Sequence, residues 1–245
     1  ALVDRPTEWI LLLDTEGFAA NNISENYDAK IFAVATLLSS KLIYNSVKII
    51  DQSDIDYLEL LARRTQLFAL KAQMENSNYT SDFNQQLLQF PSLMWVVQDF
   101  VQETNEASCR DWLLTLLSSH TRDSESYKIS LKDIFPYVDC HTLFIPSARK
   151  DILVDLSRAA EPDLLDAYRE ERDELIKKIK METKPKTKDN RPLSGTDLAL
   201  LLRALVQAAN HGSLTDMPDR WDSFLAKVQQ TSVEDCFRFY VDHMN

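Results

Sequence analysis

The sequence predicts an α/β fold in which helices flank a mainly parallel β-sheet. Short apolar runs alternate with longer segments of helical periodicity along most of the chain. Only 3 glycines occur among 245 residues, which disfavours a turn-rich β protein and favours many helices. Hydrophobic residues make up 44% and charged residues 27%, as in an ordinary globular domain. The length suits one large domain, or one domain with an appendage.

The first half predicts two strands, each followed by a helix. Residues 8–13 contain a short apolar run bounded by charge, which is typical of a buried strand in a parallel sheet. After a polar loop, residues 29–40 predict a helix packed on the sheet. Residues 41–45 predict the second strand, and the 3.6-residue apolar period of 53–75 predicts a long helix.

The second half continues the alternation. The expected elements are a strand at 91–99, a helix at 108–119, a strand at 139–145, a helix at 163–180, a helix at 194–212 and a last helical stretch at about 218–244. Ser194 and Asp197 are placed to cap the helix that Gly212 would end. The charge run 169–173 predicts a solvated helix face, and the Lys-rich segment 183–191 predicts a mobile linker.

Charge and cysteine content limit the possible partners. The formal net charge of −11 disfavours a surface for nucleic acid or anionic membranes, although one locally positive pocket can still bind a nucleotide. Cys109, Cys140 and Cys236 form no C-x-x-C pair, which predicts three reduced, mostly buried thiols in a cytosolic setting. The histidines lack metal-ligand spacing, and no stretch approaches the ~18 apolar residues of a membrane span.

An Asp-x-x-Gly tetrapeptide, Asp14 to Gly17, directly follows the first predicted strand. Open α/β sheets bind ligands at the carboxyl ends of their strands. In P-loop NTPases an Asp at such a strand end helps to hold Mg²⁺, and a glycine N–H can approach a terminal phosphate closely. The pattern therefore indicates nucleotide binding, but it also fits a strand that ends in a plain turn.

Asp99 ends the third predicted strand and has a side chain suited to guanine. One carboxylate can accept hydrogen bonds from both the N1–H and the N2 amine of guanine, whereas adenine presents an acceptor at the matching position. The alternative is a strand-terminal Asp in a turn. Ser147 and Ala148 follow the fourth predicted strand at the same edge.

Residues 12–18 read LLDTEGF, and residues 31–46 contain the patterns LLSS and YNS. Together they resemble the switch-II signature, and the helix and strand that follow it, in the family of dynamin-related guanylate-binding proteins and atlastins. Residues 95–100 resemble its base-recognition strand. Weaker similarity covers 135–136, 140–145 and 193–212. The resemblance implies a P-loop GTPase-type fold, with a GTPase domain at 1–212 and the start of a helical middle domain at 213–245.

The resemblance also implies roles for single residues. Asp14 would bind Mg²⁺ through water, Gly17 would contact the γ-phosphate, and Glu16 would organise the hydrolytic water; an exposed loop acid is the alternative for Glu16. Asp99 would select guanine. Gln98 stands where the family usually has Arg, which removes a cation near the base or the partner subunit.

Residues 147–149 (Ser-Ala-Arg) resemble the Ser-Ala-Lys loop that backs the base in other GTPases, which would give Ser147 and Ala148 a place in the base pocket.

The chain contains no G-x-x-x-x-G-K-[S/T] motif and no placeable switch-I Thr. In the resembled family both precede the switch-II strand, so we expect an accompanying amino-terminal segment, without which these residues should not hydrolyse GTP. Without it, the apolar side chains of Leu11, Leu13, Trp95 and Val97 should be partly uncovered, and the chain should aggregate or dimerise through the open sheet edge.

Two functional hypotheses follow. The first is a cytoplasmic GTP hydrolase, free or at the cytosolic face of a membrane, which binds GTP or GDP with Mg²⁺ and forms nucleotide-dependent homodimers. Any membrane association would lie outside this chain. The second is a degenerate GTPase fold that serves as a non-catalytic interaction scaffold.

Overall fold

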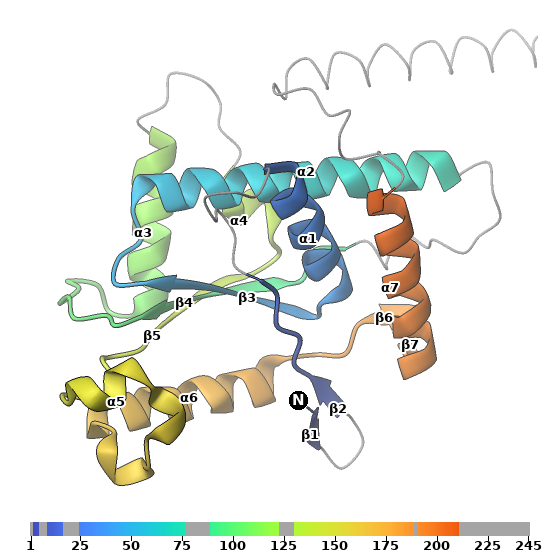
Figure 1. The fold of residues 1–245 in the computed structure, drawn as a ribbon. Coiled ribbons are helices and arrows are strands. Elements are labelled where there is room, and N and C mark those ends of the chain that lie inside the picture. Colours follow the sequence, from blue (N-terminus) through green and yellow to red (C-terminus); the bar gives the residue numbers. More distant parts are fainter. Residues whose placement is uncertain are drawn as a thin grey trace, which may run out of the picture.

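The computed structural model describes residues 2–4, 9–16, 25–76, 89–122, 130–188 and 191–210. Its centre is a three-stranded parallel sheet in the order β3-β4-β5, formed by Lys41–Val47, Ser92–Gln98 and Val138–Thr142 (Figure 1). The pairing is continuous, with Tyr44 opposite Trp95 and Trp95 opposite Cys140. Helices separate these strands along the chain, so the expected α/β fold with a mainly parallel sheet is confirmed.

The described helices are Glu25–Leu38 (α1), Gln52–Asn76 (α2), Cys109–Arg122 (α3), Leu131–Ile134 (α4), Lys150–Val154 (α5), Asp166–Glu182 (α6) and Gly195–Asn210 (α7). Residues of α1 to α4 pack on one face of the sheet, and α6 packs on the other. Two short 3₁₀ turns, η2 (Leu156–Arg158) and η3 (Glu161–Asp163), connect α5 to α6.

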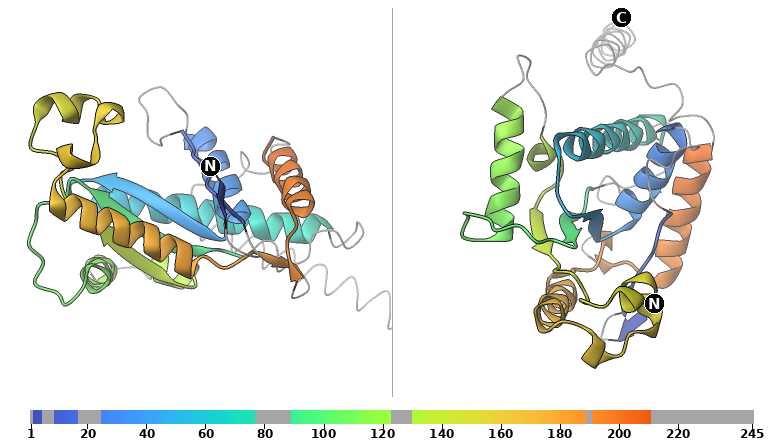
Figure 2. Two further views of the ribbon diagram at one scale, coloured as in Figure 1. Left: turned by 90° about the horizontal axis from the view of Figure 1, so that it is seen from below. Right: turned by 60° about the vertical axis from the view of Figure 1, so that its left-hand side comes forward.

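The side chains of β4 show how the layers form. Leu93, Trp95 and Val97 are fully buried in one cluster with residues of α1 to α4. Met94 and Val96 point to the opposite face, where Tyr168 and Leu175 of α6 pack on them. Figure 2 shows α6 crossing the face opposite α1 and α2. Burial on both faces explains why this strand is almost continuously apolar.

A second cluster joins α7 to α1 and α2. Leu201 and Leu205 of α7 are buried against Leu37 and Phe68. The helix begins as predicted, because Asp197 N–H donates to Ser194 Oγ (3.2 Å) and Ser194 N–H donates to Asp197 Oδ2 (3.0 Å).

The predicted strand at 8–13 is not part of the parallel sheet. Residues Trp9–Leu11 (β2) pair antiparallel with Leu2–Asp4 (β1) in a separate ribbon. Trp9 is 67% exposed and Leu13 is 58% exposed, so the prediction of a buried strand was wrong. The run is apolar enough for a sheet centre, but its backbone groups bond to β1 instead of to a strand of the three-stranded sheet.

Two of the four apolar side chains that were expected to be partly exposed to solvent are exposed, and the other two are not. Leu11 and Leu13 are exposed, whereas Trp95 and Val97 are completely buried. β4 lies between two strands, and helices cover its faces, so its side chains need no further strand. The outer edge of β3 has no partner strand among the described residues, and Val47 on this strand is 54% exposed.

Two further predictions, the start of one helix and the linker, need correction. Helix α1 begins at Glu25, before the predicted 29. Asp28 is buried in its first turns, and the hydrogen bond that Tyr57 Oη donates to its carboxylate (2.5 Å) offsets the cost of that burial. The predicted linker contains an antiparallel ribbon of Thr187–Lys188 (β6) and Arg191–Pro192 (β7).

The prediction that the charge run 169–173 is a solvated helix face is only partly correct, since the side chain of Glu171 accepts a hydrogen bond from Phe144 N–H, just beyond β5.

Within the described residues, no helix combines the length and apolarity needed to cross a membrane. The stretch predicted as the start of a middle domain lies outside the described residues.

Candidate nucleotide-binding edge

The carboxyl ends of the three parallel strands are joined by backbone hydrogen bonds. Lys48 N–H donates to Gln98 O at 2.7 Å, which ties the end of β3 to the end of β4. Leu143 N–H donates to Val97 O (2.8 Å), and Phe100 N–H donates to Leu143 O (2.9 Å). Because these bonds hold the strand ends in register, the loops that leave them start from fixed positions. This edge is where open α/β sheets bind ligands.

Two residues at this edge have left-handed backbone conformations. Lys48 has φ of 73° and Asp99 has φ of 52°. Asp tolerates this region, but a Lys in it costs about 1–3 kcal/mol, and such strain concentrates at functional sites. The bond from Lys48 N–H to Gln98 O helps to hold the strained residue.

Asp99 and Gln98 are both half-buried at the end of β4. The left-handed turn at Asp99 is the point where the chain leaves the strand. Within the described part of the chain, the Asp99 carboxylate has no hydrogen-bond or ion-pair partner. A half-buried carboxylate without a protein partner is available to accept hydrogen bonds from a ligand.

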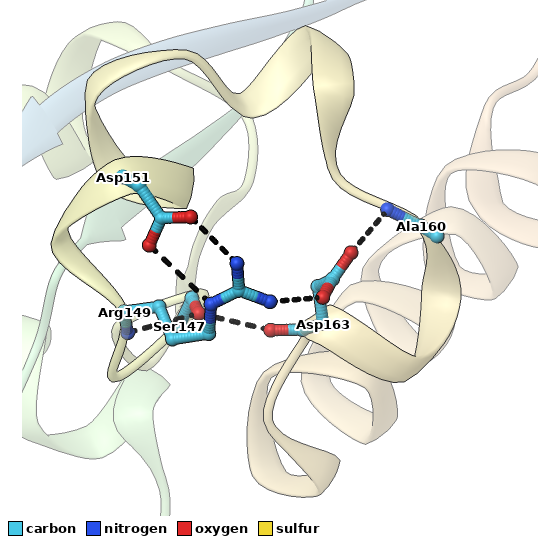
Figure 3. A network of polar contacts seen from close by, with 5 residues as sticks. All are labelled: Ser147, Arg149, Asp151, Ala160 and Asp163. Atoms are coloured by element: carbon cyan, nitrogen blue, oxygen red, sulfur yellow. Dashed lines mark hydrogen bonds and ion pairs between the residues drawn. The ribbon is translucent and has the colours of Figure 1, made fainter.

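Ser147 lies in the loop after β5 and is 1% exposed. Its Oγ donates to Asp163 O at 2.9 Å and accepts from Arg149 N–H at 3.2 Å (Figure 3). Leu165 N–H also donates to Pro146 O (2.9 Å). These bonds hold the loop against the turn that precedes α6.

Arg149 completes this network on the solvent side. Its guanidinium donates to Asp151 Oδ2 (2.6 Å) and to Asp163 Oδ1 (2.8 Å), as Figure 3 shows. The hydrogen bond with Asp151 raises the pKa of Arg149 and lowers the pKa of Asp151. Ala148, between the two anchored neighbours, is exposed, so its backbone presents a fixed surface to a ligand.

Helix α6 supports the same edge from the other face. Glu171 accepts a hydrogen bond from Phe144 N–H, just beyond β5, and its backbone oxygen lies 2.7 Å from His141 Nε2. His141 is 5% exposed, and this burial lowers its pKa. His141 is thus a buried core histidine.

Lys48, Asp163 and Glu171 were missed by sequence reasoning. Glu171 lies in the charge run 169–173, which was interpreted from the sequence as a solvated helix face. The positive φ of Lys48 has no signal in the sequence, because neither hydrophobic periodicity nor residue type marks it.

Glu16 of the Asp-x-x-Gly motif is bonded to α1 and not to the ends of β4 and β5. Tyr27 Oη in α1 donates to Glu16 Oε1 at 2.5 Å, and this bond raises the pKa of Tyr27. Asp14 is exposed, and Gly17 lies outside the described residues. In the described part of the chain, no hydrogen bond or ion pair joins Asp14 or Glu16 to Asp99 or Ser147. The structure therefore joins the β4 and β5 ends that were predicted to meet, but it does not join the Asp-x-x-Gly segment to them.

Asp14 fits Mg²⁺ only as one ligand among several. Within the described ranges no cluster of three or more His, Cys, Asp or Glu residues could hold a metal ion. Mg²⁺ commonly keeps several waters and takes one or two protein carboxylates together with substrate phosphates, so a single exposed carboxylate is compatible with it.

A family model described as "Guanylate-binding protein, N-terminal domain" matches residues 3–188 of the chain. The match covers the three-stranded sheet, its connecting helices and the loops at the carboxyl edge.

Curated relatives match almost the entire chain. It is 24% identical to guanylate-binding protein 3 of Mus musculus over 98% of the chain and 40% of that protein. It is 28% identical to guanylate-binding protein 2 of Homo sapiens over 98% of the chain and 42% of that protein. The chain thus spans about two-fifths of the length of these relatives. By the extent of the family match, the chain belongs to the guanylate-binding protein family.

Proposed function

We propose that the complete protein binds guanine nucleotides at the carboxyl edge of the sheet and hydrolyses GTP. The observation that carries this proposal is the half-buried Asp99 carboxylate, held by a left-handed turn at the end of β4, the strand that pairs with β5. Membership of the guanylate-binding protein family supports it independently.

The base would bind between the ends of β4 and β5. The Asp99 carboxylate would accept both donors of the guanine edge, which excludes adenine. Ser147 and Ala148 would back the ring, since the two bonds of Ser147 Oγ fix the loop. Gln98 would lie beside the base as a neutral group, which weakens any pairing between subunits that depends on a cation there.

The phosphate side would use the Asp-x-x-Gly motif. Asp14 would hold Mg²⁺ through water, and the ion would neutralise charge on the phosphates. Gly17 would contact the γ-phosphate, and Glu16 would orient the attacking water. The bond from Tyr27 Oη holds Glu16 away from this role, so nucleotide binding would have to release or redirect it.

The remaining features of the proposal concern the complete protein. It would be cytoplasmic or lie at the cytosolic face of a membrane, and it would form a nucleotide-dependent homodimer of dynamin-related type. Its GTPase domain would end near residue 212, and a helical domain would follow. The chain itself lacks a phosphate-binding P-loop motif, so its own residues would not suffice for hydrolysis.

Calorimetric titration of the complete protein tests the base assignment. Asp99→Asn should weaken GTP binding by roughly 2–4 kcal/mol, because a neutral amide cannot accept both guanine donors, and should improve binding of xanthine nucleotide. Asp166→Asn is the matched control, since among the described residues this exposed α6 carboxylate pairs only with Arg169. Unchanged GTP affinity in Asp99→Asn would refute the assignment. A folded wild-type protein that binds no nucleotide would instead support the scaffold hypothesis.

A further inference from the structure

Two cysteines from different elements meet at the boundary between α3 and the sheet. Cys109 is the first residue of α3, and Cys140 is in the middle of β5, 31 positions later. Their Sγ atoms are 2.6 Å apart. This separation is shorter than non-bonded sulfur atoms normally approach, and it exceeds the disulfide bond length of about 2.05 Å by about half an ångström.

The surrounding contacts hold the two thiols in this position. The residue after Cys109 is Arg110, whose Nε donates to Val138 O in β5 at 3.0 Å. The Arg110 guanidinium also lies 4.8 Å from the ring centre of Tyr137. Leu113 and Leu117, on one face of α3, are buried in the core cluster that also contains Cys140. Because both elements are packed, the backbones that carry the two cysteines are held close together, so the two sulfur atoms stay within reach of each other.

We propose that Cys109 and Cys140 form an oxidative modification site, at which peroxide converts the two thiols into a disulfide that fastens α3 to β5. In the first step hydrogen peroxide oxidises the Cys109 thiol to a sulfenic acid and releases one water. In the second step Cys140 Sγ attacks the Cys109 sulfur, the S–O bond breaks, and the hydroxyl leaves as water with the Cys140 proton. The two thiols lose two electrons in total, and the peroxide gains them.

Burial assigns the two roles. Cys140 is 1% exposed, whereas Cys109 is half-buried and open to a small oxidant. Burial therefore shields Cys140 from peroxide in the first step, while its Sγ lies 2.6 Å from Cys109 Sγ for the second. Cys140 therefore acts as the resolving thiol from a position already within reach.

Peptide mapping of the complete protein tests the proposal. Reduced protein is treated with hydrogen peroxide, its remaining thiols are blocked with N-ethylmaleimide, and it is digested with trypsin. We expect the peptide 133–149 to be linked to the peptide that ends at Arg110, and dithiothreitol to release both. The disulfide should also raise the melting temperature by roughly 5–10 °C, because it closes a loop of the unfolded chain.

Cysteine variants provide the controls. Cys236→Ser should keep the cross-link, and Cys109→Ser, at the half-buried position, should fold and abolish both the linked peptide and the thermal shift. Peroxide-treated wild type in which N-ethylmaleimide still labels both Cys109 and Cys140 would overturn the proposal. So would sulfinic acid at Cys109 beside an unmodified Cys140, because the resolving step would then have failed.

Discussion

Ser147→Ala is the sharpest test of how the loop after β5 is held. The substitution removes one hydroxyl from a side chain that is 1% exposed. It deletes the bond from Ser147 Oγ to Asp163 O (2.9 Å) and leaves Arg149 N–H without its acceptor at 3.2 Å. The alanine side chain has no polar group to replace these contacts, so the loop should open more often at the position that we propose lies against the base.

The expected magnitude follows from the two hydrogen bonds. Each bond of this kind contributes about 0.5–1.5 kcal/mol, so the loop should lose roughly 2 kcal/mol of stability against local opening. At about 1.4 kcal/mol for each factor of ten, the Arg149 amide should exchange with solvent roughly 30-fold faster. If the opening is part of global unfolding, the melting temperature should fall by about 4–8 °C.

Hydrogen exchange followed by mass spectrometry measures this effect in the complete protein. Ser157→Ala is the control, because it makes the same change in η2, where the exposed hydroxyl donates to Asp155. That variant should change stability by less than about 0.5 kcal/mol. Equal exchange around Arg149 in both variants would refute the argument that Ser147 holds the loop.

Three further predictions concern the motif acids, a buried histidine and the helical core. Asp14→Ala should cut Mg²⁺-dependent GTP affinity, whereas Glu16→Ala should leave affinity nearly intact and lower kcat; equal affinity losses in titration calorimetry would contradict this division. Burial lowers the folded-state pKa of His141, so its contribution to stability should be present above about pH 6.5 and decline as pH falls toward the folded pKa. In urea unfolding between pH 7 and 5, His141→Gln should therefore flatten the pH dependence, and an unchanged slope would argue against it. Phe68→Ala should destabilise by about 3–5 kcal/mol, because Phe68 is 1% exposed, while Leu200→Ala at a 58% exposed position should cost less than half as much in the same assay.

The sequence located the central elements well because their patterns are local. Residues 41–45, 53–75 and 91–99 were assigned correctly in type, since alternation and the 3.6-residue period record which side chains face a core. The capping pair at Ser194 was also predictable, because both partners lie within one turn. The same local reasoning failed at residues 8–13, where hydrophobicity indicates a strand but does not specify its partner.

The candidate site likewise has features that the sequence predicts and features that depend on the tertiary structure. The sequence by itself determined the residue types at the strand ends, including Asp99 with its suitability for guanine, and the resemblance that the family match confirmed. Only the tertiary structure decided that Asp99 adopts a positive φ and that the buried Ser147 donates a hydrogen bond to Asp163 O. It also decided that Cys109 of α3 contacts Cys140 of β5. These features depend on residues distant in the sequence that packing brings together, and a periodic pattern carries no information about such pairs.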